Sequence, residues 1–70
     1  MGKAIAYAVG GKTENMENFL DKEGIHESVQ EGTKQYKQEF LYVGLLIDDN
    51  TKKIFNNIEK YEKEYGITVL

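Results

Sequence analysis

The segment from Tyr36 to Asp48 constrains the fold of this chain more than any other. It reads YKQEFLYVGLLID, and an extended backbone points successive side chains to opposite faces. Because both faces are apolar, we expect a strand in the centre of a sheet that is covered on both sides. One face carries Leu41, Val43, Leu45 and Ile47, and the other carries Phe40, Tyr42 and Leu46.

Two further segments predict strands. Residues 3–9 alternate small and large apolar side chains, and Gly10-Gly11 is expected to end this strand. Residues 67–70 predict a short final strand after Gly66. Residues 26–31 contain one apolar side chain, which fits either a charged edge strand or another helical turn, and residues 31–34 predict the turn before the central strand.

Two segments have the apolar spacing of amphipathic helices. The first is expected to begin at Thr13, whose hydroxyl can cap it, and to end at Gly24 in the left-handed conformation, followed by a hydrophobic contact from Ile25. The second is expected to begin near Asp49 or Asn50, with one of them as its cap. Their apolar stripes are Met16, Phe19 and Leu20 in the first helix and Ile54, Phe55, Ile58, Tyr61 and Tyr65 in the second.

The resulting order, βαββαβ, is the split arrangement of ferredoxin-like α+β domains. We therefore predict that residues 1–70 form a single domain with an antiparallel four-stranded sheet and two helices on one face. The first and third strands are then central. The helices would cover the Leu41 face and leave the Phe40 face open, and Tyr7 would share the open face if the alternate alanines pack under the helices.

Composition narrows the classes of function. A chain of 70 residues buries only about 60% of its unfolded surface, and small domains often gain stability from disulfides, metals or oligomerisation. The chain has no Cys, which excludes disulfides and thiolate metal sites and leaves oligomerisation as the remaining stabiliser. No cofactor is expected. The net charge of −3 and the lack of Arg argue against binding of duplex nucleic acid. No apolar run approaches 18 residues, so we expect a cytoplasmic protein without a membrane partner.

Gly10, Gly11, Lys12 and Thr13 resemble the end of a phosphate-binding P-loop. The first glycine of that motif would fall at Ala6, inside the predicted strand, so the loop is too short to wrap a phosphate. A helix start after a glycine turn is the simpler interpretation. The four residues remain a candidate site for an isolated anion at the helix N-terminus.

Two polar clusters are candidate sites of chemistry. His26 is the only histidine, and Glu27 and Glu31 near it raise the alternative of a metal ligand or a proton-transfer role. Ser28 raises the alternative of a nucleophile pair with His26. Neither has a complete set of partners, so a surface histidine is favoured. Asp48, Asp49 and Asn50 have oxygen ligands for a divalent ion but lack the EF-hand spacing, so helix capping is favoured and no metal is expected.

The aromatic side chains of the open face are the most specific candidate site in the sequence. Phe40 and Tyr42 stand two residues apart, as in RNA-recognition-motif domains, and the segment 39–45 resembles that family's motif at these positions and at Val43. Gln38 and Glu39 stand where that family has basic and glycine residues. The resemblance implies stacking of single-stranded bases on Tyr7, Phe40 and Tyr42.

An apolar sheet face closed by a second subunit is the favoured interpretation of the same residues. We therefore predict a non-enzymatic interaction or regulatory module that forms a homodimer or binds a protein partner. A small hydrophobic ligand is another candidate occupant. A weak binder of single-stranded RNA or DNA is the first alternative, and a small enzyme with a site between protomers is the second. The predicted partner-binding residues are Tyr7, Phe40, Tyr42 and Leu46.

Overall fold

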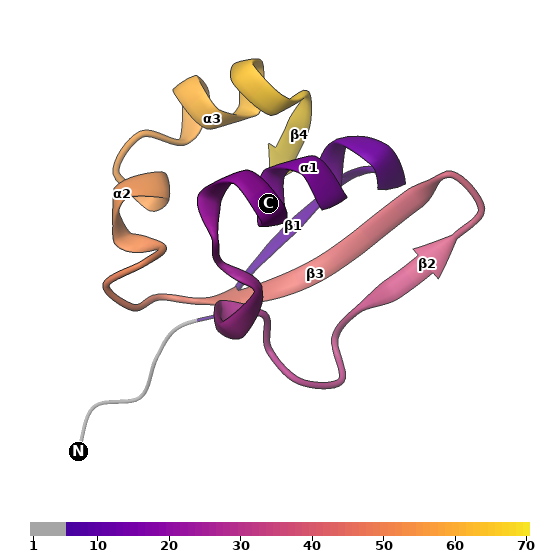
Figure 1. The fold of residues 1–70 in the computed structure, drawn as a ribbon, viewed down its shortest axis with the longest axis horizontal. Helices are drawn as coiled ribbons and strands as arrows, with labels where there is room; N and C mark the ends of the chain where they lie inside the picture. The colour runs from indigo at the N-terminus through magenta and orange to yellow at the C-terminus, as the bar shows by residue number, and fades with distance from the viewer. Residues whose placement is uncertain (1–5) are drawn as a thin grey trace.

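Residues 6–70, described in a computed structural model, form a four-stranded antiparallel sheet with three α-helices (Figure 1). The strand order is β2-β3-β1-β4, so the first and third strands are central, as predicted. Residues 3–5 of the predicted first strand lie outside the described residues. The elements are β1 (Ala6–Lys12), α1 (Thr13–Glu23), a 3₁₀ turn (His26–Ser28), β2 (Gln35–Lys37), β3 (Phe40–Leu46), α2 (Lys52–Phe55), α3 (Ile58–Tyr65) and β4 (Ile67–Val69).

The first strand does not end at the glycine pair, which corrects the prediction. Gly10 pairs with Tyr42 and Gly11 with Leu41, and the ladder continues to Lys12. A Cβ atom built on Gly10 would lie only 2.3 Å from Cδ1 of Tyr42. The glycine therefore makes room for an aromatic ring that lies across the strand, and it does not form a turn.

The hairpin between β2 and β3 also differs from the prediction. The predicted central strand from Tyr36 contains both strands, because Lys37 pairs with Phe40 and the connecting loop is only Gln38-Glu39. Gln38 has a φ of 56°, a conformation that two-residue hairpin loops usually give to Gly, Asn or Asp. The loop was not predicted, because neither of its residues is of this type and the alternating apolar pattern indicated one continuous strand.

Residues 26–31, which precede β2, contain both of the predicted alternatives, a helical turn and a short pairing at the sheet edge. Residues His26–Ser28 form a 3₁₀ turn, and Val29 then makes an isolated bridge to Leu45 of β3. The amide of Gln30 donates to the carbonyl of Gly44 at 2.6 Å, so this segment extends the β2 edge of the sheet.

The first helix carries its predicted apolar stripe and its predicted end. Gly24 has a φ of 64°, and the amide of Ile25 donates to the carbonyl of Leu20 at 3.2 Å, which is the Schellman pattern. The predicted cap at the other end is wrong. Thr13 is already the first helical residue, its hydroxyl has no partner among residues 6–70, and its amide donates to the carbonyl of Glu39.

The second predicted helix is divided into α2 and α3. Asn57 leaves the helical region with φ −140° and ψ 49°, and asparagine is a weak helix former. The predicted caps Asp49 and Asn50 are also wrong. Asp48 is the residue whose carboxylate accepts from the amides of Asn50 and Thr51, and Thr51 occupies the N-cap position of α2.

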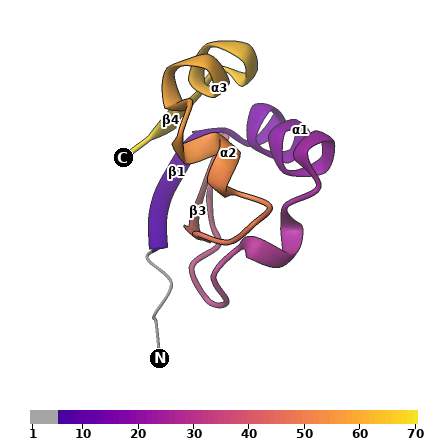
Figure 2. The same ribbon diagram turned by 90° about the vertical axis from the view of Figure 1, so that its left-hand side faces the viewer.

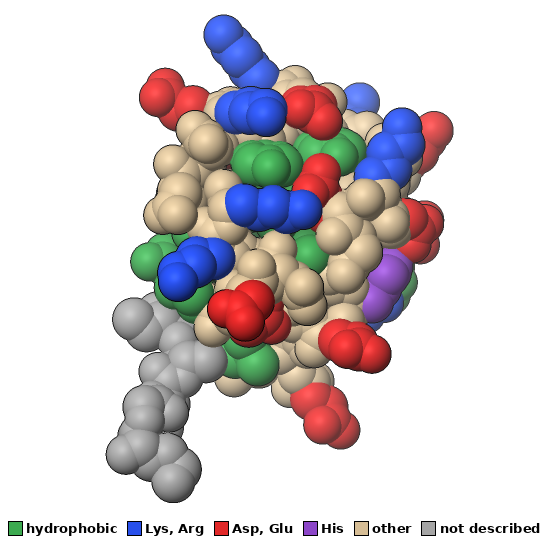
Figure 3. All heavy atoms as spheres, turned by 60° about the vertical axis from the view of Figure 1, so that its left-hand side comes forward, with side chains coloured by type: hydrophobic (Ala, Val, Ile, Leu, Met, Phe, Trp, Pro, Cys, Tyr) green, Lys and Arg blue, Asp and Glu red, His purple; other side chains and the backbone are tan. Residues whose placement is uncertain are grey.

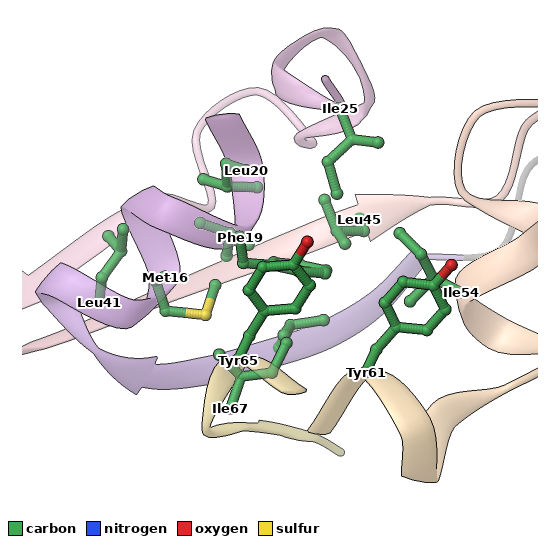
Figure 4. Close-up of a cluster of buried hydrophobic side chains, with 12 residues drawn as sticks. Met16, Phe19, Leu20, Ile25, Leu41, Leu45, Ile54, Tyr61, Tyr65 and Ile67 are labelled. Carbon is green, nitrogen blue, oxygen red and sulfur yellow. The ribbon is translucent and has the colours of Figure 1, made fainter. Parts of the chain in front are cut away.

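The helices gather on one side of the sheet, and the hydrophobic core lies between the two layers (Figures 1 and 2). Side chains from all three helices meet the inner face of the sheet there (Figure 4). The core consists of Val9, Met16, Phe19, Leu20, Ile25, Leu41, Val43, Leu45, Ile54, Tyr61, Tyr65 and Ile67.

A carboxylate joins the three helices at the edge of this core. Glu23, at the end of α1, accepts a hydrogen bond of 2.5 Å from the hydroxyl of Tyr65 in α3. Its other oxygen lies 3.2 Å from Nζ of Lys53 in α2. The bond to Glu23 raises the pKa of Tyr65, with burial adding to the shift, because both favour the neutral phenol.

Candidate functional site

The sheet face opposite the helices carries the candidate site, and we call it the open face. In antiparallel pairing, directly opposed residues point to the same side of the sheet, so the register assigns each side chain to a face. By this register the open face consists of Ala6, Ala8, Gly10, Lys12, Gln35, Lys37, Phe40, Tyr42, Gly44, Leu46 and Thr68, with Leu70 hydrogen-bonded to Ala8 at its corner.

Two of the predicted partner-binding aromatics stand together on this face. Phe40 is 44% exposed and Tyr42 is 40% exposed, although both belong to a central strand. Their ring centroids are 6.4 Å apart with an interplanar angle of 22°, so the rings stack. Leu46 lies two positions beyond Gly44 on the same face and is half-buried.

Tyr7 does not join them, which corrects the predicted placement. It pairs with Leu45 on the helix side of the sheet, and its ring stacks on Phe55 with centroids 4.3 Å apart. The alternation in the first strand left two choices of face, and the structure takes the one that turns Ala6 and Ala8 outward. The larger side chains then fill the space under the helices.

The outward alanines were missing from the predicted site, and they shape it. Ala6, Ala8 and Gly10 form a low strip along β1 beside the taller rings of β3. Small residues at every second position of the first strand are visible in the sequence. They could be assigned to the open face only when the structure showed which side of the sheet they face.

A hollow of about 290 Å³ lies at the middle of the open face, and we call it the Gly44 hollow. Ala6, Ala8 and Gly44 lie along it, and Gln30, Thr33 and Tyr42 also line it. The hydroxyl of Thr33 accepts from the amide of Gly44 at 3.0 Å and donates to the carbonyl of Gln30 at 2.6 Å. The close approach expected at Gly44 is thus made by this chain's own loop.

A second hollow, of about 260 Å³, lies on the other side of Tyr42. It is mostly apolar and is lined by Gly10, Gly11, Phe40, Tyr42, Thr68 and Leu70. The Tyr42 ring therefore lies between two depressions, over Gly10, with the Phe40 ring stacked beside it.

The charges on the open face are of one sign. Lys37, Phe40 and Lys12 form one row across three strands, and the register places no Asp or Glu among the open-face residues. The chain as a whole has a net charge of −3, so this face is a positive exception. The side that carries α2 and α3 differs, because lysines and carboxylates are interspersed there (Figure 3).

The residues of the candidate anion site are not arranged as a phosphate loop. Gly10 and Gly11 lie within β1, and the amide of Thr13 is already engaged by Glu39. A shallow hollow beside Lys12 and Thr13 is also lined by Glu14 and Glu39, whose carboxylates would repel an anion.

Within residues 6–70, the polar side chains of the His26 and Asp48 clusters form two separate pairs. His26 turns to Asp21, with Nε2 2.5 Å from the carboxylate oxygen, and both side chains are exposed. The buried Ser28 donates to Asp48 at 2.6 Å, and this bond is the main cause of a pKa lowered from the usual value for Asp48. Within residues 6–70, no three His, Cys, Asp or Glu side chains are grouped to hold a metal ion.

Comparison with known proteins gives no match. No family model matches the chain, and no curated protein or solved structure is significantly similar to it. Among the helices of residues 6–70, none has the length and apolar character needed to cross a membrane. The function must therefore be argued from the open face itself.

Proposed function

We propose that this chain is a non-enzymatic interaction module that self-associates through its open face. The observation that carries the proposal is the contrast within β3, where Leu41 and Leu45 are fully buried while Phe40 and Tyr42 are 44% and 40% exposed. Adjacent exposed aromatics on a central strand usually mark an interface. We propose the residues Phe40, Tyr42 and Leu46 as its centre, without Tyr7.

The proposal includes a ferredoxin-like arrangement of the domain. The element order with α2 and α3 counted as one helical segment, and the strand order β2-β3-β1-β4, support this assignment. An arrangement with every helix on one side leaves the other sheet face free, and a second copy can cover it without additional sequence.

Sedimentation equilibrium of the wild type and two variants tests the proposal. We expect the wild-type mass to rise above 8.0 kDa with concentration and Phe40→Ala to shift the transition to higher concentration. Tyr36→Ala is the matched control, because Tyr36 is 57% exposed but pairs with Leu41 on the other side of the sheet. A monomer at all concentrations, or equal effects of the two variants, would contradict the proposal.

A second candidate function, weak binding of single-stranded RNA or DNA, is favoured by one observation. Lys12 and Lys37 flank Phe40 in one row, which places cations beside a stacking ring. The loss of Tyr7 from the face removes one of the three expected stacking positions. Titration with oligo-U at low salt would show shifts at Phe40 and Tyr42 if this function exists, and an absence of shifts would exclude it.

A further inference from the structure

The open face is self-complementary, because it carries both a projecting ring and a depression of its own. Along β3, the exposed Phe40 ring lies two residues before Tyr42, and the Gly44 hollow lies two residues after it. A twofold axis that crosses β3 at Tyr42 exchanges these two positions between copies. Each ring would then face the hollow of the other subunit.

The positions of Lys12 and Lys37 favour this axis over one that runs along β3. If the axis ran along β3, Lys12 of one copy would face Lys37 of the other, and the repulsion would occur twice. If the axis crosses β3 at Tyr42, the two lysine rows lie on opposite sides of it. Four residues of strand separate them by roughly 13 Å, which exceeds the Debye length of about 8 Å at physiological salt.

The size of the face predicts how strong the association can be. The two strands of seven residues are about 23 Å long and the two of three residues about 10 Å, so at about 4.8 Å spacing the four strands give a flat area of roughly 300 Å². A standard interface buries about 800 Å² on each partner. We therefore expect a weak, reversible dimer, with dissociation in the micromolar range or above.

Building on the proposed function, we propose that two copies pack open face to open face with their β3 strands antiparallel. The Phe40 ring of each subunit occupies the Gly44 hollow of the other, over Ala8 and beside the Gln30 and Thr33 side chains, whose oxygens lie 3.1 Å from where a Cβ of Gly44 would be. Tyr42 meets its own copy near the axis. The row formed by Gln35, Tyr42, Gly10 and Thr68 marks the direction of the axis. The partner is a second copy of this chain.

A swap of ring and hollow tests this arrangement by sedimentation equilibrium from about 10 µM to about 1 mM. Phe40→Ala removes the ring, and Ala8→Phe fills the hollow from within, so each single variant should raise the dissociation constant at least about tenfold. The double variant Ala8→Phe/Phe40→Ala again has one ring for each hollow. We expect its dissociation constant to return to within about threefold of the wild type.

The two proposals fail in different ways. A wild type that stays monomeric overturns both. A wild-type dimer whose double variant is as weak as, or weaker than, the weaker single variant overturns the antiparallel arrangement and leaves self-association standing. Circular dichroism of each variant at low concentration checks folding, and Ala8→Leu replaces Ala8→Phe if the larger side chain disturbs the sheet.

Discussion

The two faces of β3 differ more than any other neighbouring parts of this molecule. Leu41, Val43 and Leu45 are at most 2% exposed, whereas Phe40 and Tyr42, which alternate with them, are 44% and 40% exposed. All five side chains are large or branched and apolar, so hydrophobicity does not explain the difference. The helices decide it, because they supply a second layer to one face only.

One strand can therefore contribute one set of side chains to the hydrophobic core and leave the alternate set exposed as a surface. The helix face has its partners within the chain. The open face has small residues on β1, exposed rings on β3 and two lysines, and within residues 6–70 it has no helical layer over it, although Gln30 and Thr33 cover Gly44.

The largest expected effect separates the two faces directly. Leu45→Ala should lower the free energy of unfolding by about 2–5 kcal/mol, because it leaves a cavity in the core. Phe40→Ala should cost less than about 1 kcal/mol in the dilute monomer, because it removes only cross-strand contacts. Urea unfolding at low protein concentration measures both values. Similar losses for the two variants would show that Phe40 belongs to the core.

A smaller effect is expected where the helices are joined above the core. Tyr65→Phe should cost about 1.5 kcal/mol, because the phenol donates to the carboxylate of Glu23. The raised pKa of Tyr65 adds a pH dependence. The unfolded phenol ionises first, so this contribution is complete below pH ~10 and is lost as pH rises above it.

Urea unfolding between pH 7 and pH 11 measures this loss, and the variant should fall less steeply than the wild type at the alkaline end. Tyr61→Phe is the matched control, because its ring is equally buried and its hydroxyl has no hydrogen bond among residues 6–70. Parallel pH curves for the wild type and Tyr65→Phe would contradict the role given to Glu23.

A comparable effect is expected where the Tyr42 ring lies over Gly10 on the open face. Gly10→Ala should cost about 1 kcal/mol, because its Cβ would lie 2.3 Å from the Tyr42 ring and displace it. In a Tyr42→Ala background the same change should be neutral or stabilising by about 0.5 kcal/mol, because alanine restricts the unfolded chain. A thermal-unfolding cycle of the four proteins measures the coupling. An equal cost in both backgrounds would place the strain elsewhere.

The smallest expected effect lies in the hairpin loop between β2 and β3. Gln38 has a φ of 56°, which glycine adopts without steric cost. Gln38→Gly should therefore stabilise the domain by roughly 0.5 kcal/mol, after the entropy of the unfolded glycine is counted. Glu39→Gly is the control and should destabilise, since a positive φ is not found at Glu39. Destabilisation by both changes would argue against the strained loop.

The sequence predicted the central position of β1 and β3, the apolar stripe of α1 and the two faces of β3, because each depends on local periodicity. It could not place Tyr7, because both faces of the first strand were apolar and only packing against Phe55 distinguishes them. It also missed the Gln38-Glu39 loop and the break at Asn57, where no glycine or proline marks the turn.

The depth of the open face was the least predictable feature. The Gly44 hollow combines residues of β1 and β3 with Gln30 and Thr33, and their proximity depends on sheet register and on the fold of an irregular loop. The apolar alternation within one strand specifies neither the sheet register nor the fold of this loop. The exposed rings were visible in the sequence, whereas the depression beside them was not.

Amide chemical shifts followed by nuclear magnetic resonance during dilution test whether the open face binds a second copy. We expect concentration-dependent shifts confined to the open face, strongest at Ala8, Tyr42 and Gly44, with α1 and α3 unchanged. The same dilution of Phe40→Ala should give much smaller shifts. Spectra that do not change between about 10 µM and about 1 mM, or shifts centred on the helices, would contradict the claim that the open face binds a second copy.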